Sequence, residues 1–397
     1  MRVPMLAMII LLIVNIAADA YIYIRIRRAF KTKYPSVAYL VLTILLFAYI
    51  MVALALPRRS IDNEGLRVIM FMFYSYLTFY VPKIIYIICD LISFIPRLWR
   101  CRNKIPYLSS VGIVFGLFMF ISMWWGSLVT VNDCEVVEET IEYNNLPKDF
   151  DGYKIVQFSD FHVGTYGTDT TFVAKAVNII NELRPNVIVF TGDLVNRETS
   201  ELLPFMKPLS RLKASDGVYS ILGNHDYGDY MDWDTPMAKE KNMQQLVDAQ
   251  KLMGWILLNN NHRMIKHGHD SIAMIGVENW GEPPFKKHGD LKKAYPTLND
   301  SIFKIMLSHN PNHWRGEILP KTNIDLTLSG HTHAMQVLMN IAGYKFSPAV
   351  FRYDEWAGIY DENSKKLYVN IGLGQVAFPM RVGATPEITL ITLKRKK

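Results

Sequence analysis

Five short apolar runs in the last two thirds of the chain each end in a cluster of aspartate, asparagine or histidine. The first run, residues 153–158, has the pattern of a short buried strand and is followed by Asp160 and His162. Ligand sites of α/β sheets lie outside the carboxyl ends of their strands. We therefore expect the polar side chains of the five clusters to meet at one place: Asp160, His162, Asp193, Asn224, His309, His331 and His333.

Strand and helix patterns alternate around these clusters. Apolar residues recur at helical spacing over residues 171–183, between the first two runs, so a strand, a helix and a strand follow one another. This alternation predicts an α/β domain with a largely buried sheet. The predicted strands are 135–143, at a sheet edge, and 153–158, 186–191, 217–222, 271–277, 303–307, 324–328, 367–371 and 387–393.

The residue types in the clusters indicate a metal site. Carboxylate, amide oxygen and imidazole are mixed, and the donors are numerous enough for two ions rather than one. Each cluster alone is ordinary, because Gly-Asp and Gly-Asn are common turn dipeptides and His309 could be a stray surface histidine. Only the whole set predicts a dinuclear centre.

In these motifs the chain resembles the calcineurin-like metallophosphoesterase superfamily. It carries all five of that superfamily's motifs in the same order: Asp160-x-His162, Gly192-Asp193-x-x-Asn196, Gly223-Asn224-His225-Asp226, His309 and Gly330-His331-x-His333. Within the superfamily it is most similar to membrane-associated bacterial phosphohydrolases, through 146–160, Gly372-x-Gly374 and Pro379-x-Arg381. The resemblance covers residues 153–397 and implies a central β-sandwich flanked by helices.

The resemblance also implies a role for each motif residue. Two divalent ions (Mn, Fe, Zn or Co) would be held, and a metal-bridging hydroxide would hydrolyse a phosphoester or pyrophosphate bond. His225 would protonate the leaving oxygen or stabilise the transition state, and Asp226 would orient the His225 ring. The first ion would be held by Asp160, His162 and His333 and the second by Asn224, His309 and His331, with Asp193 bridging them.

Three further residues are candidates for substrate contact. Tyr227, with Tyr230 and Trp233, could form a wall for the leaving group or pack a surface loop. Glu278 follows a predicted strand and would face the site. Arg381 could fork onto a second phosphate or form a surface salt bridge.

The first third of the chain predicts a membrane region. Apolar segments cover about 4–24, 36–56, 68–89 and 108–131, and each has about the twenty residues that a helix needs to cross a bilayer. Residues 1–131 would therefore form four transmembrane spans, 132–152 a linker with the first strand, and 153–397 the metallophosphoesterase domain. Asp19 and Lys83 lie within spans, and they are either functional or, in the interpretation we favour, lie near span ends or pair with each other.

Basic residues set the expected orientation. The first and third loops carry nine Lys and Arg, against four in the second loop and the N-terminus. Positive loops face the cytoplasm, so the protein is expected to be an integral, multi-pass membrane protein with its catalytic domain on the extracytoplasmic side.

The expected function is membrane-anchored phosphoester hydrolysis, and the anchor favours a lipid-linked or cell-envelope substrate. One alternative is a nuclease-like phosphodiesterase. Residues after 130 carry a balance of −3, whereas nucleic-acid binders present a basic surface, so a nucleic-acid partner is not expected. The other alternative is a non-catalytic membrane receptor or scaffold, which the complete ligand set disfavours.

Overall fold

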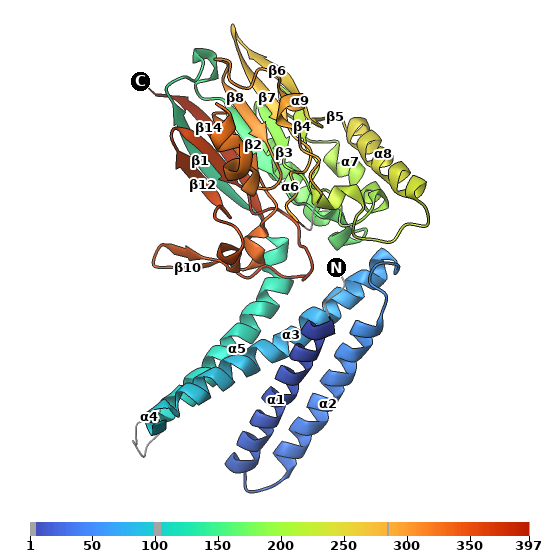
Figure 1. The fold of residues 1–397 in the computed structure, drawn as a ribbon, viewed down its shortest axis with the longest axis vertical. Coiled ribbons are helices and arrows are strands. Elements are labelled where there is room, and N and C mark those ends of the chain that lie inside the picture. Colours follow the sequence, from blue (N-terminus) through green and yellow to red (C-terminus); the bar gives the residue numbers. More distant parts are fainter. Residues whose placement is uncertain (1–4, 99–104, 284–285, 397) are drawn as a thin grey trace. The chain divides into compact units, whose positions relative to one another are not determined.

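The computed structural model describes residues 5–98, 105–283 and 286–396, which form two compact units (Figure 1). The first unit contains the N-terminal helices together with residues 377–380. The second contains Val129–Val376 and Arg381–Lys397 and holds every strand found in the described residues. We describe each unit by itself.

The N-terminal unit is helical and apolar. Its helices are α1 (Met5–Ala29), α2 (Tyr34–Ala55), α3 (Asn63–Ile92), the single turn α4 (Ile95–Leu98) and α5 (Pro106–Leu128). Among the described residues, three segments are long and apolar enough to cross a membrane: Tyr34–Ala55, Asn63–Ile92 and Tyr107–Asn132. A multi-pass membrane region is thus confirmed, while spanning by α1 stays a prediction.

The intramembrane charges of this unit are paired. Lys83 Nζ lies 2.8 Å from Asp19 Oδ1, which confirms the expected pairing. The hydroxyls of Tyr39 and Tyr80 also donate to the Asp19 carboxylate, so three helices meet at this group. Burial of a carboxylate is costly unless it is paired and hydrogen-bonded, and this cluster meets both conditions.

Two six-stranded sheets form the second unit (Figure 1). The first has the order β1-β14-β2-β3-β4-β5, and β1 is its edge strand, as predicted. The second has the order β12-β13-β9-β8-β7-β6. The first sheet contains β1 (Glu135–Tyr143), β2 (Lys154–Phe158), β3 (Val187–Phe190), β4 (Val218–Ser220), β5 (Trp255–Leu257) and β14 (Glu387–Arg395), and the second contains β6 (Asn261–His267), β7 (Asp270–Gly276), β8 (Lys304–Leu307), β9 (Leu326–Ser329), β12 (Gly358–Glu362) and β13 (Lys365–Val369).

The remaining elements are short, apart from two helices. β10 (Met339–Ile341) and β11 (Tyr344–Phe346) form a separate hairpin. The sequence did not predict β5, β6, β10, β11 or β12. The helices of this unit are α6 (Thr171–Glu182), α7 (Met206–Leu209), α8 (Pro236–Leu252), α9 (Leu291–Ala294) and α10 (Leu319–Lys321), with further helical turns at Thr130–Asn132, Lys148–Phe150, Val163–Tyr166, Thr199–Phe205, Asn224–Tyr227, Trp314–Ile318, His333–Gln336 and Pro348–Phe351.

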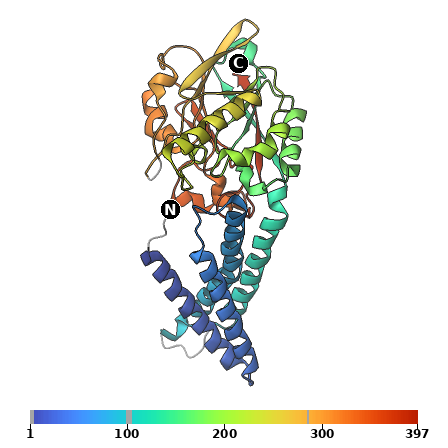
Figure 2. The same ribbon diagram turned by 90° about the vertical axis from the view of Figure 1, so that its right-hand side faces the viewer.

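Alternation along the strands explains the layers. On β2, Ile155 contributes to the core between the sheets, whereas Val156 and Phe158 contribute to a second core under α6 and α8. A third core covers the outer face of the second sheet and includes Trp314. The predicted β-sandwich flanked by helices is confirmed (Figure 2).

Strand direction brings the motifs together. Strands β2, β3, β4 and β5 run parallel to one another, and so do β7, β8, β9 and β13, whereas β14, β6 and β12 pair with these two sets antiparallel. Gln157 of β2 joins the two sheets, because its Nε2 donates to the carbonyl of Ser329 on β9 at 2.8 Å. The loops that follow β2, β3, β4, β8 and β9 can therefore converge on one point.

Candidate metal centre

All seven predicted ligand residues lie together at these strand ends. Asp160 and His162 follow β2, Asp193 follows β3 and Asn224 follows β4, while His309 follows β8, and His331 and His333 follow β9. Two groups of side chains each place three ligand atoms within 4.8 Å of one another. The groups are Asp160, His162 and His333, and Asp193, His309 and His331.

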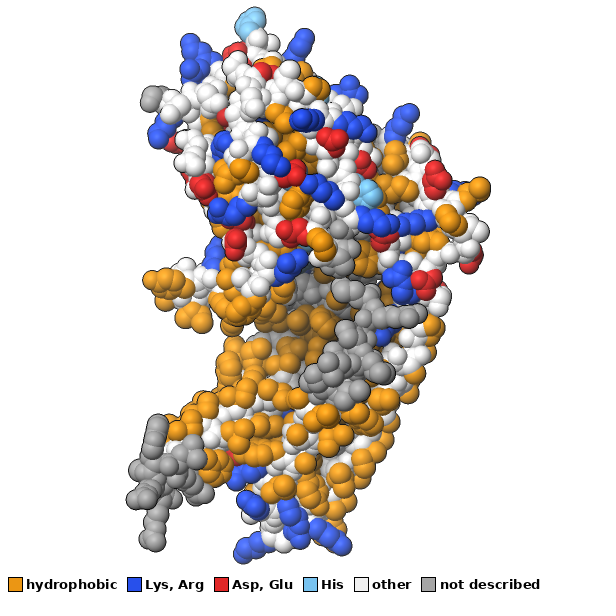
Figure 3. All heavy atoms as spheres, in the orientation of Figure 1, with side chains coloured by type: hydrophobic (Ala, Val, Ile, Leu, Met, Phe, Trp, Pro, Cys, Tyr) orange, Lys and Arg blue, Asp and Glu red, His pale blue; other side chains and the backbone are white. Residues whose placement is uncertain are grey.

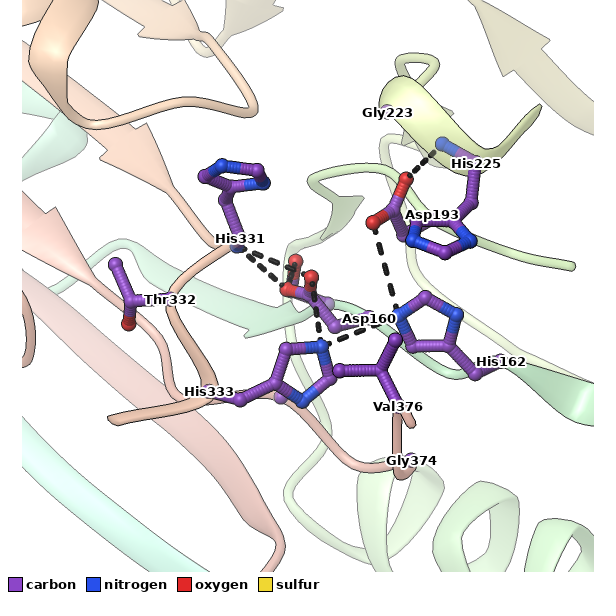
Figure 4. A network of polar contacts seen from close by, with 12 residues as sticks. Asp160, His162, Asp193, Gly223, His225, His331, Thr332, His333, Gly374 and Val376 are labelled. Carbon is purple, nitrogen blue, oxygen red and sulfur yellow. Dashed lines mark hydrogen bonds and ion pairs between the residues drawn. The ribbon is translucent and has the colours of Figure 1, made fainter. Parts of the chain in front are cut away.

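The first group is buried between the loops after β2 and β9. His162 Nε2 lies 3.1 Å from His333 Nε2, and Asp160 Oδ1 lies 3.3 Å from the same atom of His333. The main-chain N–H of His331 donates to both oxygens of Asp160, and the Ser159 hydroxyl donates to Oδ2. Figure 4 shows the His162 and His333 rings directed toward one another beside the Asp160 carboxylate. These contacts hold one carboxylate and two imidazoles around one point.

The second group is centred on His309. Its Nε2 lies 3.1 Å from His331 Nδ1, 3.2 Å from Asp193 Oδ2 and 3.2 Å from Asn224 Oδ1. The Asn224 amide nitrogen donates to the hydroxyl of Tyr230 at 2.7 Å, which turns Oδ1 toward the centre. Asn224 Oδ1 thus lies beside the second group, and its role as a metal ligand stays a prediction.

Asp193 connects the two groups through one oxygen. Its Oδ2 lies 3.2 Å from His309 Nε2 and 3.6 Å from His162 Nε2, one atom from each group. Its Oδ1 accepts the main-chain N–H of His225 at 2.8 Å and is held outside the centre. This is the placement required of a carboxylate that bridges two ions.

The spacing of the donors fits metal ions. Around an ion with bonds of about 2.1 Å, neighbouring ligand atoms lie about 3.0–3.4 Å apart in octahedral or tetrahedral geometry. The contacts within each group have this spacing, while the Asp193–His162 contact between the groups is longer, at 3.6 Å. A cation between the two imidazole nitrogens that lie 3.1 Å apart could take a lone pair from each in place of a hydrogen bond between the rings. Mixed nitrogen and oxygen donors are compatible with Mn, Fe, Zn or Co. The residues therefore fit two divalent ions.

The electrostatics of the centre favour positive charge. Burial opposes charge on His309, but the carboxylates of Asp193 and Asp160 and the hydrogen bond with the Thr191 carbonyl together outweigh it and raise the pKa of His309 to about 9. Burial, with the charge on His309, lowers the pKa of His331 to about 3. Burial alone would raise the pKa of Asp193, yet the surrounding imidazoles hold it well below its usual range. A cation at this point would take over the role of the proton on His309.

The main chain around the ligands is strained. Asp160 has φ 50°, His162 46°, Asp193 62°, His331 75° and His333 49°, all in the left-handed region. Each costs about 1–2 kcal/mol for a residue with a side chain. Such strain persists where the surrounding structure imposes it, commonly at functional sites.

Two motif glycines allow the close approach of the carboxylates. A Cβ at Gly223 would lie 2.2 Å from Asp193 Oδ1, and a Cβ at Gly330 would lie 2.3 Å from Asp160 Oδ2. These glycines are therefore required by contact with the ligands. The sequence showed the motif but not this reason for it.

Comparisons with known proteins agree with this geometry. Residues 153–335 match the family described as calcineurin-like phosphoesterase, and residues 2–130 match the family described as probable calcineurin-like phosphoesterase, transmembrane domain. The Bacillus subtilis metallophosphoesterase YkuE is 36% identical over 268 residues, which are 66% of this chain and 85% of that protein. The chain belongs to the calcineurin-like phosphoesterases.

Two other relatives extend the comparison. A Campylobacter jejuni metallophosphoesterase is 28% identical over 401 residues, 98% of each chain, so the likeness includes the helical unit. A Chlamydia trachomatis protein named UDP-2,3-diacylglucosamine pyrophosphatase LpxG is 30% identical over 300 residues, 62% of this chain and 86% of that protein. The family and the two metal-binding triads identify this calcineurin-like phosphoesterase as a metal-dependent phosphohydrolase.

His225 and Asp226 have different surroundings from those expected. The expected contact of Asp226 with His225 is wrong, because the Asp226 carboxylate accepts main-chain N–H groups of Asp193, Leu194, Val195 and Gly223. The carbonyl of Asn196 accepts the His225 Nδ1–H at 2.7 Å instead. Asp226 thus holds the loop that carries Asp193, and Asn196 orients His225.

Arg381 is a structural residue of this phosphoesterase, and both roles expected for it are wrong. Its side chain is fully buried, and its guanidinium donates to the carbonyls of Ile371, Gly374 and Ala384. Its Nη2 also lies 3.2 Å from His333 Nδ1. A guanidinium engaged in this way cannot fork onto a substrate phosphate.

The other candidates for substrate contact lie beside each other. The Tyr227 hydroxyl is 3.4 Å from Glu278 Oε1, and the Tyr227 ring stacks on His288 with centroids 4.3 Å apart. Asn260 also donates to Glu278, at 2.7 Å. Contact of Tyr227 or Glu278 with a substrate stays a prediction.

Sequence reasoning missed one residue beside the centre and left another open. The Tyr353 hydroxyl lies 3.1 Å from His331 Nε2, and nothing in the sequence around it forms a motif. Tyr230, weighed as a substrate wall or as packing, stacks on His225 with centroids 4.0 Å apart and holds Asn224. Only the folded chain brings these rings to the ligands.

Proposed function

We propose that this protein hydrolyses a phosphoester or pyrophosphate bond of a lipid-linked or cell-envelope substrate at a dinuclear metal centre. The observation that carries the proposal is Asp193 Oδ2, which lies within 3.6 Å of a ring nitrogen from each ligand group. A shared carboxylate offsets the charge of two neighbouring cations and fixes their separation. Such pairs are typical of enzymes that cleave phosphate esters.

The chain's own residues supply positioning and proton transfer. When bound, two divalent ions supply Lewis-acid charge for the phosphoryl oxygens and lower the pKa of a water molecule. Asp160, Asp193 and Asn224 would supply the oxygen ligands of the two ions. Asn224 would do so without adding negative charge. The Asn196 carbonyl binds Nδ1–H of His225, which leaves Nε2 free to exchange a proton with the leaving oxygen.

His225 requires a charged substrate to act as an acid. Burial lowers the pKa of its ring, so the neutral form predominates at pH 7 in the free protein. Negative charge on a bound phosphoryl group favours the protonated ring. Proton donation by His225 would therefore be coupled to substrate binding.

Two observations support a lipid-linked substrate. The chain carries its own membrane region, so the phosphoesterase unit stays near a bilayer. In addition, the Chlamydia relative is named for a pyrophosphatase of UDP-2,3-diacylglucosamine. We further propose that the catalytic unit lies on the extracytoplasmic side, from the excess of basic residues in the first and third loops.

The test combines metal analysis with an assay on the full chain in detergent. We would compare the parent, Asp193→Ala and, as a control, Asp234→Ala at an exposed position. We expect two metals per chain and Mn²⁺-dependent hydrolysis of bis-p-nitrophenyl phosphate or p-nitrophenyl phosphate in the parent and the control, and loss of both in Asp193→Ala. The preferred ester separates diester from monoester chemistry. A parent that binds no metal and cleaves neither ester would refute the proposal and favour a scaffold.

A further inference from the structure

The hairpin β10–β11 and the turn that follows it expose large apolar side chains. We call residues 339–351 the apolar hairpin. Ile341 is 68% exposed, Tyr344 84% and Phe351 84%, and Met339, Phe346 and Val350 are also exposed. Figure 1 shows β10 projecting from the rest of the phosphoesterase unit, and Figure 3 shows hydrophobic side chains gathered on this projection. Large apolar side chains that gather in one place are normally buried.

Packing within the unit does not explain these side chains. The hairpin forms a sheet of its own with only three residues in each strand, and its three facing pairs run from Met339 and Phe346 to Ile341 and Tyr344. An isolated two-stranded ribbon is at best marginally stable in water. The exposed residues named above are not among the members of the hydrophobic cores in the described part of the chain. An apolar environment outside the protein would explain why these apolar side chains are exposed.

The base of the apolar hairpin is fastened to the metal centre. The Ser347 hydroxyl donates to the carbonyl of Ala334, the residue after His333. Two residues after the hairpin, the Tyr353 hydroxyl lies 3.1 Å from His331 Nε2. The hairpin is thus inserted between a metal-ligand motif and a residue that contacts one of the ligands.

A lipid bilayer is the partner that fits. The chain carries a membrane region that ends at Leu128, and the seven steps to Glu135 span at most about 25 Å when fully extended, so the unit cannot leave the membrane. The apolar hairpin contains Lys345 and no acidic residue, and it is followed by Arg352, which lies 3.7 Å from Glu282, and then by Asp354 and Glu355. Exposed aliphatic and aromatic side chains with a cation among them are typical of segments that bind membrane interfaces.

We propose that the apolar hairpin inserts into the bilayer surface and guides a lipid-borne phosphoester to the metal centre. This inference rests on the proposed function and adds the substrate class, a phosphoester that carries an acyl or alkyl chain. The fastening of the hairpin to Ala334 and Tyr353 would couple lipid contact to the ligand loop. A water-soluble ester would reach the centre without it.

The kinetic test uses two esters with the same reactive group. Full-length protein in nanodiscs that contain phosphatidylglycerol would be assayed with hexadecyl p-nitrophenyl phosphate and with methyl p-nitrophenyl phosphate. We expect Ile341→Asn/Tyr344→Asn/Phe351→Asn to lower kcat/KM at least about tenfold for the hexadecyl ester and to leave the methyl ester unchanged. The control Met237→Asn/Leu252→Asn changes residues that are 77% and 78% exposed and should affect neither ester. An equal fall in kcat/KM for both esters, or no fall for either ester, would overturn the proposal.

A second measurement tests insertion independently of catalysis. Tyr344→Cys, in a chain whose Cys89, Cys101 and Cys134 are replaced by alanine, would carry a polarity-sensitive fluorophore. We expect doxyl-labelled lipids to quench the fluorescence of the label at position 344. They should not quench the same label on Lys266→Cys, at an exposed position of β6. A label at 344 that is shielded from water but not quenched by lipid would assign the hairpin to a protein partner and refute insertion. If the parent cleaves neither ester, the proposed function fails, whereas this measurement still decides insertion.

Discussion

Gly223→Ala tests whether the position of Asp193 controls the centre. Gly223 has φ −99° and ψ −178°, which any residue adopts, so the added methyl group acts through contact alone. Its Cβ would lie 2.2 Å from Asp193 Oδ1 and 2.6 Å from Asp193 N, whereas Cβ atoms essentially never approach closer than 3.0 Å. The carboxylate must therefore retreat by at least about 0.8 Å.

A displacement of this size has a large expected effect on catalysis. Misplacement of a reacting or positioning group by about 1 Å costs about 100-fold in rate, or about 2.7 kcal/mol. Because Oδ2 of Asp193 serves both ligand groups, we expect loss of metal from both sites and a fall of about 100-fold in kcat/KM for p-nitrophenyl esters. Metal content per chain and steady-state kinetics on the purified protein would be measured together.

Gly276→Ala is the matched control for this variant. Its Cβ would lie 2.3 Å from Leu258 Cβ and 2.7 Å from the Leu258 carbonyl oxygen, so the clash is similar but falls on a core residue. Overpacking of this kind costs about 1–3 kcal/mol of stability. We expect the control to melt at a lower temperature while the folded protein keeps two metals and its activity. Our reasoning fails if Gly223→Ala binds two metals and retains the parent's kcat/KM.

Two other perturbations address the surroundings of the centre. Tyr230→Phe removes the hydroxyl that accepts a hydrogen bond from the Asn224 amide at 2.7 Å. Loss of such a supporting contact lowers metal affinity about 10- to 100-fold. Metal titration of the folded variant checks this expectation, and an unchanged affinity would contradict it. Burial raises the pKa of Glu201 from 4.5 to about 7. The ionised carboxylate therefore destabilises the fold above about pH 7, by about 3 kcal/mol at most. This destabilisation is relieved as the pH falls from about 7 to about 4.5. Glu201→Gln should therefore melt higher than the parent at pH 8 and lose that advantage by pH 5, as thermal unfolding at both values would show.

The sequence by itself determined the candidate ligands and the class of the domain. Asp160, His162 and the later motif residues each follow an apolar run, and parallel strands bring such positions to one edge. The resemblance of the motif set to the calcineurin-like metallophosphoesterases then implied the β-sandwich. These features depend on short-range pattern and residue chemistry, which the sequence displays directly.

Only the tertiary structure decided which groups support the ligands. Asp226 lies next to His225 in the sequence, yet its carboxylate faces the Asp193 loop, because adjacent residues on a tight turn point in different directions. Arg381 is a cation late in the chain, and only the fold shows that it is enclosed by main-chain carbonyls. Tyr353 reaches His331 across a 22-residue separation. Long-range packing sets all three contacts, and no local pattern encodes it.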